Sequence, residues 1–462
     1  MDASNHPIER LQRVVGDVMT STETMRHMHH LCDLIGPRPA GSTAEAMTRD
    51  YLLDRFRSYG LANVTSEAFP APHWRRGSTR ASIVVPTQRS IELLALPKNR
   101  THQLRAEVAS ASFRTIAEFD RVASSLRGKI VLIYGEAVTG AGPGVLHRAE
   151  RVRLANEAGA AAFLWASNWR GRVLPTGSMD GEIAKRMPAF GITLEDAGLI
   201  ERLLTNQGRV VLDITTDNET SVGTSWNVWG DINSAQDAPM VLVTAHYDSH
   251  DITDGAFDNA AGCAIVLECA RTLAHLRSSI GCNVRFLIFS AEEVGLHGSK
   301  QYALRHADEL PRIRFMINAD GLGVMPATKY VHVPLHTGAA RYLRDVFAHY
   351  GFDVYVDNAL NLNWDHAPFA VRGVPTGSIT ARWAPGTQVH FGHTAADTLD
   401  KVDASELRSI VAATVTAVWH IANDDDPSLT HLTPDAVDSA LAAAGKQHML
   451  AQFVDVDPAD GG

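Results

Sequence analysis

From residue 226 onward, apolar segments of strand length alternate with amphipathic segments of helix length, and this alternation constrains the fold more than any other feature. Strands are expected at 239–249, 283–290, 312–320 and 330–336, with helices at 259–276, 299–306 and 339–351. Apolar strands that alternate with helices indicate a mainly parallel sheet whose two faces are both covered. The predicted fold class is therefore α/β, a mainly parallel mixed sheet sandwiched by helices.

The chain before this region does not show the same alternation of strand-like and helix-like segments. Two helices are expected around the loop 35–42 (IGPRPAGS), with Ser42 or Thr43 capping the second. Short strand-like segments then follow, with helical stretches between some of them, at 81–85, 129–134, 161–166 and 209–214. We interpret this part as a β-rich module inserted into the main domain.

The predicted organisation has three parts. The main domain is discontinuous and comprises residues 1–73 and 217–425, and the module at 74–216, called the insert below, interrupts it. A chain of 462 residues exceeds what one core usually organises, which is consistent with two bodies. Residues 426–462 are predicted to form a peripheral helix and tail.

Charge and hydropathy exclude several classes of partner. The formal charge is −10, and clustered Lys and Arg are missing, so a nucleic-acid partner is not expected. Met1–Val18 lacks the unbroken apolar run of a signal peptide, and we find no segment that reads as a membrane span. We therefore expect no membrane partner and a cytoplasmic location. The four cysteines form no CxxC pair and are expected to be reduced and buried.

Acidic and imidazole side chains occur where the predicted strands end. His246 and Asp248 end one strand, Glu292 and Glu293 follow the next, and Asp320 closes the third. Functional groups in open α/β sheets gather at the carboxyl ends of the strands. A hydrolytic zinc pair needs imidazole and carboxylate ligands and a free carboxylate that accepts a proton from water. Because Glu292 and Glu293 are adjacent, one of them can bind a metal ion while the other stays free.

Two further residues complete the expected constellation. Asp258 lies in GAFDNAAG, a turn of small residues at a helix start, which suits a carboxylate bridging two ions. His393 lies in HTAADT and supplies a second imidazole. Asp248, two positions after His246 in an extended segment, is expected to orient that imidazole. The sequence therefore predicts a two-metal hydrolytic site.

The segments AHYDS, GAFDNAAG, FSAEEVGLHGS, NADG and HTAADTLDKVD together resemble the di-zinc exopeptidase family of bacterial leucyl aminopeptidases, carboxypeptidase Q and glutamate carboxypeptidase. The resemblance covers most of the chain. It implies that the main domain is a catalytic domain with the zinc-exopeptidase fold. The insert, through GKIVLIYGE, EAGAAAFLWAS and MPAFGIT, resembles the protease-associated domain that many members carry.

The resemblance also implies a division of labour among the metal ligands. Asp258 would bridge two Zn²⁺ ions, Glu293 and His393 would bind one of them, and His246 and Asp320 would bind the other. Co²⁺ or Mn²⁺ tolerate similar ligands and are expected as substitutes. Peptides are the implied substrates, and a homodimer is compatible with the sequence.

Glu292 is the general base implied by the resemblance. It would take a proton from the water shared by the ions, and the hydroxide would attack the scissile carbonyl. The segment NWDHAPF resembles the family's Ser-Asp-His stretch, with Trp364 in place of Ser. Asp365 and His366 are therefore expected to line the substrate pocket.

Which peptide end enters the pocket stays open. We favour an aminopeptidase, while the spacing HxDxxDxxxGAxD is closer to carboxypeptidase Q, so a carboxypeptidase or dipeptidase is the alternative. Arg382 is a candidate clamp for a substrate carboxylate. A glutaminyl-cyclase-like acyltransferase or an inactive receptor-like protein is disfavoured by the complete ligand set and the intact Glu292–Glu293 pair.

Other histidines receive structural interpretations. His250 is four residues after His246, but the segment is leaving a strand for a loop, so we expect it in a pocket wall rather than at a metal. His27, His29 and His30 lie in a helical region where adjacent positions point in different directions. They are expected on the surface or in packing contacts.

Overall fold

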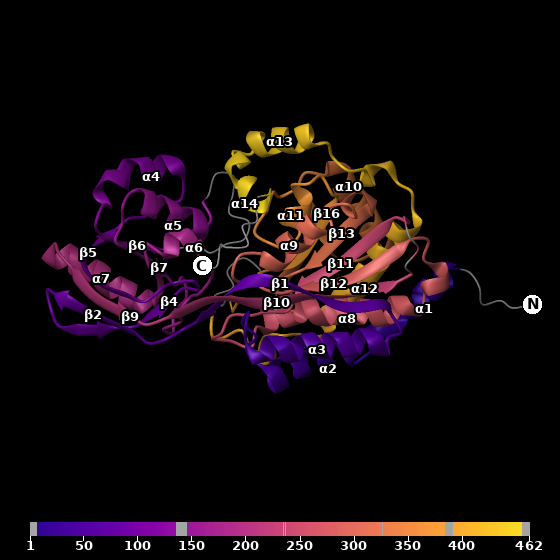
Figure 1. The fold of residues 1–462 in the computed structure, drawn as a ribbon, viewed down its shortest axis with the longest axis horizontal. Coiled ribbons are helices and arrows are strands. Elements are labelled where there is room, and N and C mark those ends of the chain that lie inside the picture. The colour runs from indigo at the N-terminus through magenta and orange to yellow at the C-terminus, as the bar shows by residue number, and fades with distance from the viewer. Residues whose placement is uncertain are drawn as a thin grey trace, which may run out of the picture.

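The computed structural model describes residues 7–134, 146–233, 235, 237–325, 327–383 and 391–454. Figure 1 shows two bodies, each built around a sheet, and the smaller one is drawn in purple and magenta. The long strands β1 (Ala62–Arg75) and β10 (Glu219–Ile232) connect them as an antiparallel pair. The chain thus leaves the larger body along β1 and returns to it along β10.

The larger sheet has the strand order β1-β10-β12-β11-β13-β16-β14-β15. Its remaining strands are β11 (Met240–His246), β12 (Asn283–Phe289), β13 (Ile313–Ala319), β14 (Ala327–His332), β15 (Tyr355–Asp357) and β16 (Thr376–Trp383). The four neighbouring strands β12, β11, β13 and β16 are parallel, whereas β10 and β14 pair with them antiparallel. The predicted mainly parallel mixed sheet is confirmed.

Successive residues of the central strands are buried on opposite faces of this sheet. Val241 and Val243 of β11 belong to one core, and Met240 and Leu242 belong to the other. The first face is covered by α1 (Pro7–Thr20), α2 (Glu23–His29), α3 (Thr43–Ser58), α8 (Ala261–Ala274), α10 (Thr337–Tyr350) and α12 (Ala404–Asn423). The second is covered by α9 (His297–Arg305) and α11 (Ala367–Ala370). Helices therefore cover both faces, as the near-continuous apolar strands predict.

The smaller sheet has the strand order β3-β2-β9-β5-β6-β7-β8-β4. Its strands are β2 (Thr79–Val85), β3 (Arg89–Ile91), β4 (Leu93–Ala95), β5 (His102–Ser110), β6 (Ile130–Tyr134), β7 (Ala162–Ala166), β8 (Ala189–Ile192) and β9 (Val211–Thr216). Its helices are α4 (Ile116–Val122), α5 (Arg148–Glu157), α6 (Gly181–Ala184) and α7 (Leu194–Gln207). Leu132 and Ile133 of β6 enter different cores, so this sheet also separates two apolar layers. The exact limits of the insert stay a prediction.

The first and last helices of the described residues pack on the larger body. The predicted cap of α3 is confirmed, because the Ser42 hydroxyl accepts a hydrogen bond of 3.0 Å from the Glu45 N–H. After α12 come α13 (Pro434–Ala443) and α14 (Ala451–Val454), and Phe453 packs with residues of α11. The predicted tail at 455–462 lies outside the described residues.

The cysteine thiols lie in the interior of the protein. Cys32, Cys263, Cys269 and Cys282 are all buried and free, as expected. None of the helices in the described part of the chain has both the length and the apolar character needed to cross a bilayer.

His27 is buried between α2 and α3. Its Nδ1 lies 2.6 Å from the Tyr51 hydroxyl, and its Nε2 lies 2.9 Å from the Tyr59 hydroxyl. His29 pairs with Asp33 on the surface, and His30 stacks on Tyr51. His27 and His30 thus both contact Tyr51, whereas His29 lies on the surface. Burial lowers the pKa of His27 to about 3.

This lowered pKa makes stability depend on pH. The unfolded chain protonates His27 near pH 6.5, whereas the folded chain keeps it neutral down to about pH 3. Its contribution to stability is therefore present above pH 6.5 and is lost as the pH falls through this window. At pH 5, His27→Gln should reduce the slope of the unfolding free energy against pH by about 1.4 kcal/mol per unit.

Urea unfolding at several pH values measures this slope. The exposed His29→Gln is the matched control. Equal slopes for the wild type and His27→Gln would show that His27 is protonated in the folded protein.

Candidate metal centre

The predicted site residues meet at one edge of the larger sheet. His246 is the last residue of β11, Glu292 and Glu293 lie just beyond β12, and Asp320 follows β13. Because β11 pairs in parallel with both β12 and β13, the carboxyl ends of the three strands lie side by side. The strand-end residues singled out in the sequence are thus brought together by the sheet itself.

Asp258 lies between two groups of these side chains. It belongs to the turn Ala256–Ala260, which leads into α8. Its Oδ1 lies 3.3 Å from His246 Nε2, and its Oδ2 lies 3.2 Å from His393 Nε2. Each carboxylate oxygen therefore faces a different imidazole, an arrangement that suits a carboxylate shared by two ions.

The remaining predicted ligands divide between the two imidazoles. Asp320 Oδ1 lies 3.7 Å from His246 Nε2, and Glu293 Oε2 lies 3.6 Å from His393 Nε2. Glu292 Oε2 is farther from the same atom of His246, at 4.0 Å. All five predicted ligands are therefore within reach of two neighbouring cation positions.

Several of these ligand atoms lack a hydrogen-bond partner. Among the described residues, His246 Nε2, Glu293 Oε1 and Asp320 Oδ2 are buried without one. An unsatisfied buried polar atom costs about 1–3 kcal/mol, which makes such a cluster unusual without a ligand. Imidazole nitrogen and carboxylate oxygen are the donors that zinc binds. The residues present therefore fit a pair of divalent ions.

The electrostatics of the cluster lead to the same conclusion. Burial raises the pKa of Glu292 and of Glu293 well above the usual range, and neighbouring carboxylates add to the effect. Burial alone would lower the pKa of His246, but Glu292 and Asp320 raise it well above its ordinary value. These shifts express a shortage of positive charge, which bound cations would supply.

Asp248 has two structural roles, of which the sequence suggested only one. His246 Nδ1 lies 3.1 Å from the Asp248 carbonyl oxygen and 3.4 Å from its Oδ1, consistent with the expected support of that imidazole. In addition, the Asp248 carboxylate accepts hydrogen bonds of 3.1 Å from the N–H groups of both Glu292 and Glu293. Asp248 thus joins the ends of β11 and β12.

Asp397 supports the site in a way that sequence reasoning missed. Its carboxylate accepts hydrogen bonds from the N–H groups of Phe257 and Asp258, at 2.6 and 3.0 Å. It is buried, and burial raises its pKa to about 7. The only signal in the sequence was its position four residues after His393, within HTAADTLDKVD. Asp397 therefore holds the backbone that presents Asp258.

Arg38, from the loop before α3, was also missed. Its guanidinium is fully buried and donates to the backbone carbonyl oxygens of Tyr247, Asp254 and Gly255, at 2.8, 2.7 and 3.2 Å. The backbone N–H of Arg38 donates to the Ser249 hydroxyl at 3.0 Å. Arg38 thereby shapes the loop between His246 and Asp258.

The insert contributes directly to the candidate metal centre. The carbonyl oxygen of Thr176 lies 3.2 Å from His393 Nδ1, and the Thr176 N–H donates to the His393 carbonyl oxygen at 2.8 Å. A histidine whose Nδ1–H is bound in this way presents Nε2 to a metal. The guanidinium of Arg148 and the ring of His393 both contact Gly177, where a Cβ would lie 2.6 Å and 2.9 Å from them.

Comparison with known proteins identifies the larger body. Residues 227–418 match the model of peptidase family M28, and residues 95–200 match that of the PA domain. Residues 227–418 are therefore a peptidase family M28 domain, called the M28 domain below. The predicted family and the predicted protease-associated insert are both confirmed.

Three relatives illustrate the similarity. Carboxypeptidase Q from Rattus norvegicus is 30% identical over 307 residues, and the match spans 64% of this chain and 64% of that protein. A peptidase M28 precursor from Shewanella amazonensis SB2B is 26% identical, with 92% and 98% of the chains covered and a TM-score of 0.77. BSAP, a zinc aminopeptidase from Bacillus subtilis, is 25% identical, with 89% and 97% covered and a TM-score of 0.65.

The residues expected in a substrate pocket differ in their surroundings. Asp365 is fully buried, burial raises its pKa to about 7, and its charge also raises the pKa of Glu292. His366 is also buried, with Nε2 2.9 Å from the Asn361 carbonyl oxygen. The Arg382 guanidinium lies over the Tyr330 ring, 4.5 Å from its centroid. The pocket assignment of Asp365 and His366 stays a prediction.

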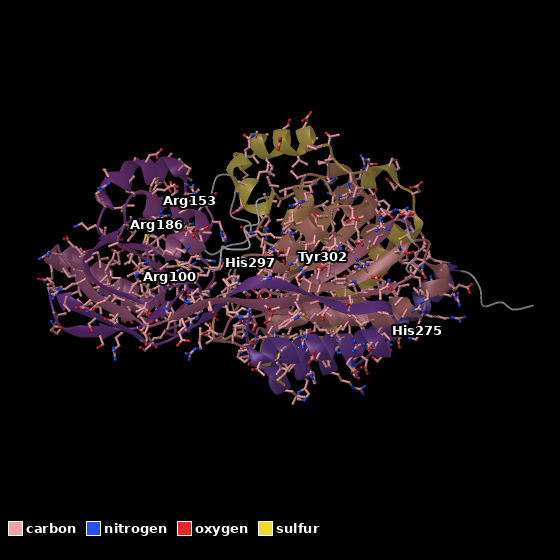
Figure 2. The ribbon with its side chains drawn as sticks, in the orientation of Figure 1. Arg100, Arg153, Arg186, His275, His297 and Tyr302 are labelled. Atoms are coloured by element: carbon pink, nitrogen blue, oxygen red, sulfur yellow. The ribbon has the colours of Figure 1, made fainter. Side chains whose placement is uncertain are left out.

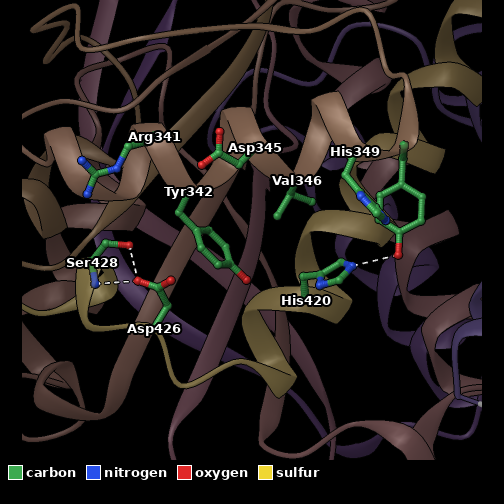
Figure 3. A pocket seen from close by; sticks show the side chains of 9 residues that line it. Arg341, Tyr342, Asp345, Val346, His349, His420, Asp426 and Ser428 are labelled. Atoms are coloured by element: carbon green, nitrogen blue, oxygen red, sulfur yellow. Dashed lines mark hydrogen bonds between the residues drawn. The ribbon is translucent and has the colours of Figure 1, made fainter.

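Two other features of the M28 domain lie outside the metal cluster. Figure 2 labels His297 where the two bodies meet, and burial lowers its pKa well below the ordinary value. A surface hollow of about 410 Å³ lies along α10 and α12. Its lining includes Tyr350 and His420, which are joined by a hydrogen bond of 2.9 Å (Figure 3). The hollow contains none of the predicted site residues.

The support from Asp397 can be tested through metal affinity. Asp397→Ala should weaken binding of a divalent metal by about 10–100-fold. The N–H groups of Phe257 and Asp258 lose the carboxylate that accepts their hydrogen bonds, while every proposed metal ligand is retained. Competition between the protein and a chromogenic chelator for Zn²⁺ measures this affinity. Asp400→Ala is the control, since Asp400 is exposed in the same segment. Unchanged affinity in Asp397→Ala would show that the turn Ala256–Ala260 keeps its shape without the Asp397 carboxylate.

Proposed function

We propose that this protein is a metal-dependent exopeptidase, an aminopeptidase that releases N-terminal residues from peptides. The observation that carries the proposal is Asp258, whose two oxygens lie 3.3 and 3.2 Å from two different imidazoles, beside the spare carboxylate of Glu292. A solved relative described as a zinc aminopeptidase, of which the match covers 97%, supports both the metal and the activity.

Two zinc ions are proposed for the site. His246 and Asp320 would hold one, Glu293 and His393 would hold the other, and Asp258 would be shared by both. Co²⁺ or Mn²⁺ are accepted in their place. When bound, the ions polarise the scissile carbonyl and make a water molecule more acidic.

Glu292 is proposed as the general base. It lies 4.0 Å from His246 Nε2, farther than Asp258 and Asp320, which leaves its carboxylate available to water. It accepts a proton from the attacking water and later donates that proton to the departing amine. The hydrogen bond from its N–H to Asp248 keeps its backbone in place during both transfers.

The charge around the site favours the end of a peptide that carries an amine. Asp365 is buried close enough to raise the pKa of Glu292, and this carboxyl comes in addition to the proposed ligands. A cationic α-amine is stabilised beside such an excess of carboxylates. We therefore assign the N-terminus of the substrate to this side of the site.

A carboxypeptidase is the second candidate, and Arg148 favours it. The guanidinium stacks over Trp165, at 5.1 Å from the ring centroid, and donates to the Ser178 carbonyl oxygen. It approaches His393 across Gly177 and is thus a fixed cation beside the proposed ions. A guanidinium in this position can bind a C-terminal carboxylate. The relative named carboxypeptidase Q is consistent with this second candidate.

Substitution of Glu292 tests the mechanism. Glu292→Gln should retain the metal and lower turnover by about 10²–10⁴-fold, because proton transfer is lost while the ligands remain. His393→Ala should lose metal together with activity. Metal content by plasma mass spectrometry and hydrolysis of an aminoacyl nitroanilide are measured on the same preparations. Near-normal activity in Glu292→Gln would contradict the assigned base.

Blocked peptides test the direction of attack. An aminopeptidase should cleave a C-amidated peptide but not its N-acetylated form, because it requires the free amine. A carboxypeptidase gives the reverse result, and a dipeptidase is stopped by either block. Mass spectrometry of the products distinguishes these outcomes. Arg148→Gln should impair cleavage only if the protein is a carboxypeptidase or a dipeptidase.

A further inference from the structure

His250 lies beside the proposed metal ligands, although it was expected in a pocket wall. Its Nε2 is 2.9 Å from Glu293 Oε2, and its ring centroid is 4.6 Å from that of His393. Ligand atoms of these three residues all lie within 4.8 Å of one another. His250 is 3% exposed, and among the described residues its Nε2 is one of the buried atoms without a hydrogen bond.

Two of the separations match those between atoms bound to one ion, and the 3.6 Å between His393 Nε2 and Glu293 Oε2 is slightly longer. Two donors that each lie about 2.0–2.1 Å from zinc, at angles between 90° and 109°, are about 2.8–3.4 Å apart. The distance of 2.9 Å between His250 and Glu293 falls in this range, as does the 3.2 Å between His393 and Asp258. The 2.9 Å contact with Glu293 Oε2 does not have the geometry of a hydrogen bond, so the imidazole nitrogen stays unsatisfied, and coordination removes the cost of burying it.

The residues on both sides of His250 are held firmly. The Ser249 hydroxyl accepts from the Arg38 N–H, and the Asp251 carboxylate accepts two hydrogen bonds from the Arg76 guanidinium, at 2.8 and 2.7 Å. Arg76 directly follows β1, where the chain enters the insert. The imidazole is thus presented by a loop that is fixed before any ion arrives.

We propose that His250 is a sixth ligand of the metal pair and binds the ion held by Glu293 and His393. This inference rests on the metal pair of the proposed function and makes its two positions unequal. One position has a single imidazole, from His246, whereas the other has two. The position with two imidazoles fills first and favours Zn²⁺ and Co²⁺ over Mn²⁺, because nitrogen ligands suit the former ions better.

Metal titration tests the inequality. In the wild type, competition with chelators should show two binding steps, and His250→Ala should weaken the tighter step by about 10-fold or more while leaving the other within about 3-fold. His297→Ala is the matched control, since His297 is a buried histidine near Glu293 outside both ligand groups. Two unchanged binding steps in His250→Ala would overturn the proposal.

Counting imidazole ligands separates coordination from a hydrogen bond between His250 and Glu293. In the Co²⁺-loaded wild type, proton NMR should show three hyperfine-shifted imidazole N–H signals that exchange with water. His250→Ala and the milder His250→Asn should each show two. Two signals in the wild type would overturn coordination by His250 without needing any variant.

The same samples distinguish this inference from the proposed function. If the wild type binds two ions and hydrolyses peptides but shows only two imidazole signals, the role of His250 is refuted and the proposed function stands. A wild type that binds no metal refutes the proposed function as well.

Discussion

Mutual repulsion among buried carboxylates is the constraint on which the rest of this structure depends. Asp258, Glu292, Glu293 and Asp320 converge where three parallel strands end, and at most 13% of each side chain is exposed to the solvent that would screen its charge. Charges buried in this way are tolerated only when cations and hydrogen bonds compensate them. The site is therefore costly for the folded chain alone and favourable for a chain that binds divalent ions.

Holding such groups together requires support from distant parts of the chain. Asp248 joins the ends of β11 and β12, Asp397 holds the turn of Asp258, and Arg38 shapes the loop between them. The hydrogen bonds of the Asp397 carboxylate and the Arg38 guanidinium are made with backbone groups, and Asp248 contacts only Nδ1 of His246, so the ligand side chains keep their other lone pairs for metal. The same backbone contacts restrict where the proposed ligands can lie.

The insert supplies residues that contact the candidate site. Thr176 orients His393, Arg148 reaches the same imidazole across Gly177, and Arg76 holds the loop of His250. One edge of the metal centre is therefore built by residues on the far side of the β1–β10 connection (Figure 1). A motion of the insert relative to the M28 domain would change the surroundings of one proposed metal position, that of His393, more than those of the other.

The sequence by itself determined the α/β class, the covered sheet and the strand-end positions of His246, Glu292, Glu293 and Asp320, because these depend on local periodicity and on where strands stop. Asp258 and His393 were also found, through motifs in their immediate neighbourhood. Only the tertiary structure revealed Arg38, Asp397, Thr176 and the contact of His250 with Glu293. These contacts join segments far apart in the chain, several through backbone atoms, and such contacts leave no pattern in residue spacing.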